Sequence, residues 1–371
     1  MKKIKLYSYY FPNWHQDDRN DNWHGKGWTE WEVLKCARAR FVGHKQPLIP
    51  TWGYEDESKP EVMEKKIETA KKYGIDGFIF DTYYYDDGSY RIKCIDEGFL
   101  KAKNSKDFEF AILWCNHDAI YAHPSPRVII SPVLKSGAVN KESFVKITNV
   151  FIDKYFTQPN YIRVDGKLFF AIYNVYKLIG ELGGIDECIA ALDDLRERVR
   201  EKGLGELFIG TVSAIMEDNF SSYVDINNIL NKLKIDISLR YWWPVKFEDK
   251  RLTIEYDEFA QNGLKAQKED FINLDIPCVC HMMSGLDQSP RTIQSEIYES
   301  LNIYPWYTIC VGSTPEKYGK AFKEMYELAK NNGRSSFMTC IWNEWTEGNY
   351  LEPEEEYGYG FLEEIKKVME E

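Results

Sequence analysis

Eight short apolar runs separated by amphipathic segments predict that this 371-residue chain folds as a (β/α)8 barrel. Repeated strand–helix units imply a parallel sheet, and eight strands are the number that closes such a barrel. Barrels of this kind run from about 200 to over 400 residues as one domain, so we expect residues 1–371 to form a single domain. An open, doubly wound sheet is the alternative. It usually carries a glycine-rich phosphate loop after its first strand, whereas Pro12-Asn13-Trp14-His15 follows the first strand here.

The predicted strands are rich in β-branched and aromatic residues, which suit a sheet buried on both faces. In chain order they cover Ile4–Phe11, Ile75–Tyr83, Phe108–Cys115, Leu168–Tyr173, Leu207–Val212, Ile235–Tyr241, Cys278–Met283 and Ser336–Ile341. Two helices have clear end signals, because Pro60 and Pro315 stand at first helical positions and Gly74 and Gly333 follow the last ones. The predicted helices cover 60–73, Glu142–Phe156, Ile185–Lys202 and Pro315–Asn332.

A long connection of about residues 12–60 separates the first strand from the first of these helices. It is rich in Trp and Gly, and ordered loops of this length usually carry function. Trp28 and Trp31 within it are either a platform for a sugar ring or packing that holds the loop, and Glu30 either lines a site or is structural. His15, His24 and His44 share the loop, but their spacing matches no compact metal site. We expect no metal and no cofactor.

Composition narrows the classes of partner. The formal charge of −12 opposes binding to a nucleic-acid backbone. The eight cysteines form no Cys-x-x-Cys motif, and several lie in apolar runs, which indicates buried thiols of a reducing compartment. With no leader-like start and no apolar run long enough to span a membrane, a cytoplasmic location is expected. The sequence leaves the oligomeric state open.

Polar and aromatic side chains follow almost every predicted strand, at the end of a barrel where catalytic groups lie. Aromatic residues make up 15% of the chain, and aromatic faces suit the apolar C–H faces of sugars, although many rings will simply fill the core. These positions predict a polar cup with aromatic walls. The predicted substrate-binding residues are Tyr10, Trp14, His15, Trp28, Asp81, Tyr83, Asn116, His117, Tyr173, Tyr241, Trp242, Asp287, Arg291, Asn343 and Trp345.

The segment after the last predicted strand contains two carboxylates, Glu344 and Glu347, flanked by Trp342 and Trp345. Apolar rings and a neighbouring like charge both favour the neutral form of a carboxyl group, so one acid can hold a proton while the other is ionised. Glycosidic bond cleavage needs this division between an acid and a second carboxylate. A Glu-x-x-Glu pair alone is usually a solvated helix face; its place at the end of a barrel strand favours catalysis.

Two long motifs and several shorter ones carry a resemblance to a known family. The motif near the C-terminus reads Asn343-Glu344-Trp345-Thr346-Glu347-Gly348, followed by Leu351-Glu352-Pro353 and Tyr357-Gly358-Tyr359. The motif near the N-terminus reads Tyr10-Phe11-Pro12-Asn13-Trp14-His15, followed by Asn20-Asp21-Asn22-Trp23-His24-Gly25-Lys26-Gly27-Trp28-Thr29-Glu30-Trp31 and Gly43-His44-Lys45-Gln46-Pro47. These motifs, with 73–78 and 287–291, resemble the glycoside hydrolase family 99-like, or WbsX-like, proteins, which are related to endo-α-mannosidases.

The resemblance implies a retaining glycoside hydrolase or transglycosylase that acts on an α-linked oligosaccharide or polysaccharide. It implies that Glu344 deprotonates the sugar 2-hydroxyl, which attacks the anomeric carbon, and that Glu347 is the acid and then the base. Leu286-Asp287-Gln288 and Asn116-His117-Asp118 depart from the pattern in loops that touch substrate. The sugar therefore stays open, with mannose as one candidate. A glycosyltransferase and a glycan-binding helper of surface-polysaccharide synthesis are the alternatives.

Overall fold

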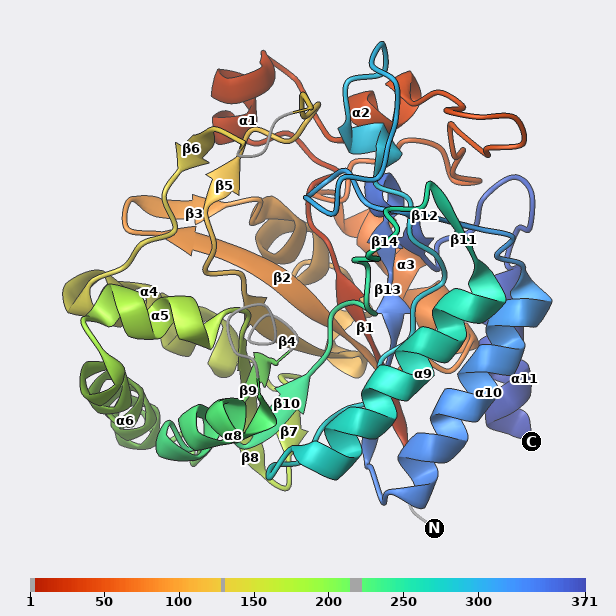
Figure 1. Cartoon of the computed structure of the whole chain (residues 1–371). Coiled ribbons are helices and arrows are strands. Elements are labelled where there is room, and N and C mark those ends of the chain that lie inside the picture. The colour runs from red at the N-terminus through yellow and green to blue at the C-terminus, as the bar shows by residue number, and fades with distance from the viewer. Residues whose placement is uncertain (1–3, 128–130, 214–221) are drawn as a thin grey trace.

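The computed structural model describes residues 4–127, 131–213 and 222–371. A parallel sheet curls around the centre of the molecule in the order β10-β9-β8-β4-β2-β1-β13 (Figure 1). Every neighbouring pair along this path is parallel. The strands are β1 (Lys5–Tyr10), β2 (Gly77–Tyr85), β4 (Glu109–Trp114), β8 (Lys167–Ile172), β9 (Leu207–Val212), β10 (Ile237–Leu239) and β13 (Ser336–Ile341). Together with the segment that joins β10 to β13, they form the predicted (β/α)8 barrel.

The barrel closes between β10 and β13 through a segment that is not a continuous strand. We predicted a strand over Cys278–Met283, but it pairs only at single bridges, Ser238 with Cys278 and His281 with Met338. Its first residues hydrogen-bond to β10 and its later ones to β13, as Val279 N donates to Ser238 O (3.0 Å) and Met282 N to Met338 O (3.0 Å). Because the segment pairs with each neighbouring strand over only a few residues, it forms no regular ladder of hydrogen bonds. The predicted strand Ile235–Tyr241 is likewise shortened to β10.

Helices cover the outside of the barrel. In Figure 1, α9 and α10 lie along one side, and α4, α5, α6 and α8 lie on the other. The helices are α1 (Asp18–His24), α2 (Trp31–Cys36), α3 (Pro60–Lys72), α4 (Lys141–Phe151), α5 (Val175–Leu182), α6 (Ile185–Glu201), α8 (Tyr223–Lys232), α9 (Tyr256–Asn273), α10 (Pro315–Asn331) and α11 (Gly360–Glu370). The four predicted helices are present, and the one expected over Glu142–Phe156 changes at Ile152 from an α-helix to a π-helical turn that ends at Phe156.

Sequence signals explain where the best-defined helix begins and how it packs. In α10 the Thr314 side chain accepts a hydrogen bond from Lys317 N, and Pro315 occupies the first turn. Tyr318, Phe322 and other residues at helical spacing are buried against the barrel. The same spacing in α3 buries Met63, Ile67, Ala70 and also the charged Lys66, an exception that matters for the site.

Short strands and turns extend the barrel at its two ends. The remaining strands are β3 (Gly88–Tyr90), β5 (Ala119–Ile120), β6 (Val133–Lys135), β7 (Arg163–Val164), β11 (Thr253–Glu255), β12 (Ile309–Val311), β14 (Asn343–Glu344) and β15 (Asn349–Tyr350). Short helical turns cover Cys94–Phe99, Ser105–Asp107, Ser289–Arg291 and Trp345–Glu347. The long connection of residues 12–60 contains α1 and α2, which lie together above one end of the barrel (Figure 1).

Two glycines allow two loops to touch above the barrel. A Cβ added to Gly285 would lie 2.7 Å from Gly348 O, and one added to Gly348 would lie 2.8 Å from Asp287 N. Gly348 also has a φ of 66°, which disfavours any side chain. The loop after the 278–283 segment and the loop after β13 are therefore in backbone contact, sealed by a hydrogen bond from Asp287 N to Glu347 O (2.7 Å).

Two predictions about solvent and membrane exposure can be compared with the structure. Cys115, Cys278, Cys280 and Cys340 are buried and unbonded, as their apolar surroundings predicted. Among the residues that the structure describes, no helix combines the length and the apolar character needed to cross a membrane.

Candidate active site

The chain after β13 folds back on itself at the mouth of the barrel. β14 pairs antiparallel with β15, so that Asn343 faces Tyr350 and Glu344 faces Asn349. A single 3-10 turn, Trp345–Glu347, joins the two strands. This short hairpin places both predicted catalytic glutamates on one stiff unit.

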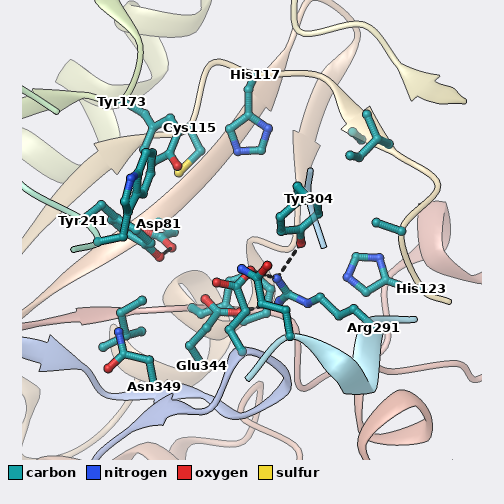
Figure 2. A pocket seen from close by; sticks show the side chains of 18 of the residues that line it. Asp81, Cys115, His117, His123, Tyr173, Tyr241, Arg291, Tyr304, Glu344 and Asn349 are labelled. Atoms are coloured by element: carbon teal, nitrogen blue, oxygen red, sulfur yellow. Dashed lines mark hydrogen bonds and ion pairs between the residues drawn. The ribbon is translucent and has the colours of Figure 1, made fainter. Parts of the chain in front are cut away.

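One guanidinium holds both glutamates. Arg291 donates from Nη2 to Oε1 of Glu344 and from Nη1 to Oε1 of Glu347. Its Nε donates to Oε1 of Glu30 (2.9 Å), and its Nη1 also donates to the phenol oxygen of Tyr304 (2.6 Å; Figure 2). The donors of a guanidinium share one plane, so the carboxyl groups on its two arms stand side by side. We call Arg291, Glu30, Glu344 and Glu347 the Arg291 cluster.

The acids of the Arg291 cluster differ in proton affinity. Burial raises the pKa of Glu344 well above its ordinary value; Arg291 counteracts part of this, and the charges of Glu347 and Glu30 add to it. Burial alone would also raise the pKa of Glu30, but the charge of Arg291, with contributions from the contact with His123 and the charge of Arg91, outweighs it and holds that pKa well below its usual range. Burial therefore favours the neutral form of Glu344, whereas the neighbouring positive charge favours the ionised form of Glu30.

A second buried acid lies at the end of β2. Burial, with a smaller contribution from Glu347, raises the pKa of Asp81 to about 8, although a hydrogen bond from Tyr241 and the charge of Arg91 lower it. Tyr241 donates to Oδ2 of Asp81 (2.5 Å), while Oδ1 is buried without a partner. At neutral pH Asp81 is thus mostly a neutral acid with one oxygen available to a ligand.

These groups face one cavity of about 550 Å³. Figure 2 shows Asp81, Tyr241 and Tyr173 grouped on one wall, apart from Arg291 and Tyr304. Aromatic side chains make up much of the lining, in keeping with a site for sugar rings. They are Phe11, Trp23, Tyr83, Tyr85, Tyr90, Tyr173, Tyr241, Trp242, Tyr304 and Tyr307.

The structure brings about half of the predicted substrate-binding residues, and both predicted catalytic residues, to this cavity. The predicted residues on its wall are Asp81, Tyr83, His117, Tyr173, Tyr241, Trp242, Arg291, Glu344 and Glu347. They come from the ends of five different strands and from the loop after residues 278–283, as expected for a barrel.

The predicted residues from the end of β1 lie behind the wall. Tyr10 is fully buried and donates to Oε2 of Glu57 (2.9 Å), and His15 Nδ1 lies 3.0 Å from Oε1 of the same residue. Trp14 packs against Trp31, with ring centroids 4.0 Å apart. Because β1 ends in large side chains that pack inward, these groups anchor the long loop and do not face the cavity. Trp31, left open by the sequence, is packing.

Two predicted amides join strand ends. Asn116 exchanges two hydrogen bonds of 2.8 Å with the backbone of Asn174, which ties the end of β4 to the end of β8. Asn343 does the same with Phe11, donating to its O (2.9 Å) and accepting from its N (2.8 Å). With both amide groups satisfied by backbone, neither side chain is on the cavity wall.

The remaining predicted residues also lie off the wall. Asp287 accepts from the imidazole of His44 (2.8 Å), and Trp345 is fully buried beneath the hairpin. Trp28 is half-buried and stacks on His24, at a centroid distance of 4.3 Å, so it supports a wall residue from behind. The three histidines of the long loop are thereby kept apart on separate partners. Within the described ranges no group of three metal-binding side chains converges.

A second buried ion cluster lies on the other side of the hairpin from the cavity. Glu352 accepts from Nε1 of Trp342 and Nε1 of Trp345, both at 2.8 Å, and pairs with Lys66 Nζ at 2.7 Å. Lys66 Nζ also donates to the phenol oxygen of Tyr10 (2.9 Å). The Lys66 cluster thus comprises Lys66, Glu352, Glu57, Tyr10, Trp342 and Trp345. It fixes Trp345, which stands between the two glutamates in the chain.

The cavity also contains residues that sequence reasoning did not select. Arg91, His123 and Tyr304 come from loops whose paths no periodicity indicates. Glu30 is fully buried behind the wall. Its two possible roles were recognised from the sequence, and the structure places it on Arg291 and 3.3 Å from His123. The Trp-Thr-Glu-Trp motif around it was the signal that could have found it.

Fold and site together define a glycosidase-like (β/α)8 barrel with paired acids in an aromatic cavity. A family model described as "Glycosyltransferase WbsX" matches residues 6–365, and the chain belongs to this family. Among curated relatives, "Uncharacterized protein WxcX" of Xanthomonas campestris pv. campestris (strain B100) is 23% identical over 98% of this chain and 49% of its own length. The chain thus spans about half the length of the relatives it matches.

Solved structures support the fold. The GH99 endo-alpha-mannosidase from Bacteroides thetaiotaomicron is 14% identical with a TM-score of 0.59, covering 100% of this chain and 97% of that one. A "Glycoside hydrolase-like protein" is 14% identical with a TM-score of 0.62, covering 100% and 94%. These likenesses confirm the predicted barrel, and at such identities they show the fold alone. The predicted family resemblance is confirmed by the family model.

Proposed function

We propose that the protein is a retaining glycoside hydrolase or transglycosylase that acts on an α-linked glycan, with mannose-containing glycans as one candidate. The observation that carries the proposal is the meeting of Glu344 and Glu347 on one guanidinium at an aromatic cavity of about 550 Å³. Two neighbouring carboxyl groups, one to accept a proton and one to donate a proton, are what glycosidic cleavage requires. The endo-alpha-mannosidase fold of a similar structure supports the same reaction class.

In the proposed reaction Glu344 removes the proton of the sugar 2-hydroxyl, and the resulting oxygen forms a bond to the anomeric carbon. Glu347 gives its proton to the leaving oxygen as the glycosidic bond breaks. Water, or an acceptor sugar, then opens the three-membered ring at the anomeric carbon, as Glu347 takes its proton and Glu344 returns a proton to the 2-oxygen. Arg291 holds both carboxyl groups in register throughout.

The raised pKa of Glu344 has a consequence for this mechanism. A carboxylate with a high pKa is a strong base, but it must first lose its proton. Activity should therefore fall on the acid side at a pH well above the ordinary glutamate value. A pH–rate profile whose acid limb lies at the ordinary value would contradict the role of Glu344 as base.

The main test replaces each acid by its amide. Glu344→Gln and Glu347→Gln should fold normally and lose about 10²- to 10⁴-fold in turnover in a glycan-release screen over α-linked oligosaccharides. Glu356→Gln is the matched control, because Glu356 pairs with Lys45 at the surface. Wild-type turnover in both amide variants would remove the assignment.

A second substrate separates the two roles. An aryl glycoside with a good leaving group needs no proton from an acid, so Glu347→Gln should regain much of its first-step rate on it while Glu344→Gln should not. Rescue of Glu344→Gln instead would exchange the two roles.

The family description favours one further candidate, a glycosyltransferase. A transferase should bind a nucleotide sugar, and calorimetry with common donors tests this directly. Binding that Arg291→Met abolishes would favour the transferase over the hydrolase. A glycan-binding helper would instead bind oligosaccharides with no cleavage, in wild type as in the amide variants.

A further inference from the structure

One cationic side chain on the cavity wall has no carboxylate partner. Arg91 lines the cavity and is 7% exposed, yet its Nε has no hydrogen-bond partner. In the part of the chain that the structure describes, no acid forms an ion pair with it. The other two guanidiniums of the wall differ, because Arg240 binds Asp270 and Arg291 binds three glutamates. A buried charge without a partner is costly, so this one is of interest as a ligand group.

Aromatic rings hold Arg91 in one position. Its guanidinium carbon lies 5.1 Å from the ring centroid of Phe11, 5.0 Å from Tyr83 and 4.5 Å from Tyr90. Its backbone has a φ of 57°, and its N–H donates to Oδ2 of Asp17 (3.0 Å). Ring faces stabilise the charge, and a hydrogen bond with the Tyr90 phenol adds to this. Neither replaces the two parallel in-plane hydrogen bonds that a carboxylate, sulfate or phosphate accepts.

The surroundings of Arg91 are rich in neutral donors. His24, His117 and His123 line the same cavity. Burial lowers the pKa of all three, and the charge of Arg91 lowers each further; the pKa of His24 falls to about 4. At neutral pH these imidazoles are uncharged, so their ring N–H groups can donate hydrogen bonds to a ligand beside the guanidinium. The charge of buried Glu30 acts on Arg91 but forms no ion pair with it.

Arg91 lies close to the cation that binds the paired acids. The guanidinium carbons of Arg91 and Arg291 are 5.1 and 5.2 Å from the centroid of the same Phe11 ring. Neighbouring sugars of one glycan chain can therefore reach both.

We infer that Arg91 is a specificity residue that binds an anionic oxygen-acid group on the glycan, so that the substrate is an acidic polysaccharide or oligosaccharide. The group is a carboxylate, sulfate or phosphate carried by a sugar next to the one at the paired acids. The inference rests on the proposed function only where it calls the glycan a substrate. Binding of an acidic glycan at Arg91 requires no cleavage.

Equilibrium binding to the full chain tests the inference. The probes are α-linked oligosaccharides of glucuronic, galacturonic and mannuronic acid, each paired with its carboxyl-reduced neutral counterpart. Sulfated and phosphorylated hexose oligosaccharides, paired with the unmodified ones, distinguish the three anions. At least one acidic probe should bind the wild-type protein tenfold to a hundredfold tighter than its neutral partner, as expected for charge-assisted hydrogen bonds.

Two variants and a control locate the effect. Arg91→Gln should lose the preference for the acidic probe, and Arg91→Lys, which keeps the charge and the ring contacts, should retain only part of it. Arg19→Gln is the matched control, because Arg19 also lies over an aromatic ring of this wall, Tyr85 at 5.4 Å, but pairs with Asp87 off the cavity. The Arg19→Gln variant should prefer the acidic probe over the neutral one as strongly as the wild-type protein does.

The outcomes separate this inference from the proposed function. Equal binding of acidic and neutral probes in every wild-type pair overturns it, as does a preference that survives Arg91→Gln; Arg91 would then be a purely structural contact for its rings. Arg91-dependent binding of acidic glycans without cleavage supports the inference and refutes the glycosidase. Cleavage of neutral glycans at a rate independent of Arg91 supports the glycosidase and refutes the inference about Arg91.

Discussion

Two buried ion clusters lie on either side of the hairpin that carries Glu344 and Glu347, and they differ in how completely their charges are satisfied. In the Lys66 cluster both partners of the ion pair are sealed, at 2% and 4% exposure, and Glu352 is bound by two indoles as well as by Lys66. In the Arg291 cluster the side chain of Glu347 is 18% exposed, and burial raises the pKa of Glu344 well above its ordinary value. A buried cluster whose hydrogen bonds are all made stabilises the fold. A partly exposed cluster whose acids can exchange protons can also act in catalysis.

The largest expected effect comes from removing the cation of the open cluster. Arg291→Met leaves three acids without a counter-charge and should cost about 3–5 kcal/mol of unfolding free energy. It should also reduce the turnover of the folded fraction by about 10²- to 10³-fold, because the two carboxyl groups lose their common donor. Denaturant unfolding and glycan release measure the two effects separately; loss of stability alone would make Arg291 a structural residue.

The matching change in the sealed cluster should affect stability only. Lys66→Met leaves Glu352 and Glu57 buried without a cation, and about 3–5 kcal/mol of unfolding free energy should be lost, while turnover per folded molecule stays close to wild type. Lys65→Met is the control, because Lys65 is 37% exposed and its pair with Glu55 should contribute about 1 kcal/mol or less. A large loss of turnover in the folded Lys66 variant would erase the distinction between the clusters.

The smallest effect, counted over a single pH unit, is a slope of stability with pH. Asp81 keeps its proton to about pH 8 in the folded chain, whereas an unfolded aspartate loses it near about 3.9. Between these values the folded state binds more protons, so this group makes stability fall as pH rises, by up to about 1.4 kcal/mol per pH unit. Asp81→Asn cannot titrate. As pH rises across this window, the unfolding free energy of the variant should therefore increase relative to that of the wild type. A difference between the two that does not change with pH would show that Asp81 is already ionised.

The sequence predicted the barrel well because its strands are buried on both faces and so are apolar along their whole length. The 278–283 segment looked the same, but an apolar run does not reveal whether its hydrogen bonds go to one neighbour or are divided between two. Lys66 is a residue whose burial the sequence pattern did not predict. It lies in an amphipathic helix pattern as an ordinary surface lysine, and only the distant Glu352 makes its burial possible.

The candidate site was predicted in part for the same reason. Strand ends indicate which residues reach the mouth of the barrel, and this found Asp81, Tyr241 and the paired glutamates. It could not distinguish side chains that face the cavity from those that pack behind it, such as Trp14 and Tyr10, because both follow the same strand. Arg91 follows a short strand outside the barrel, so that the same rule does not apply to it.

The contact between Gly285 and Gly348 limits how this protein can be diversified. Directed evolution of barrel enzymes usually randomises the loops above the sheet to seek new substrates. Here a methyl group at either position would collide with backbone of the opposite loop, so the loop that carries both acids would have to shift. A mutant library aimed at altered selectivity should leave both codons unvaried and place its diversity at other residues that line the cavity, such as Trp242 and Tyr307.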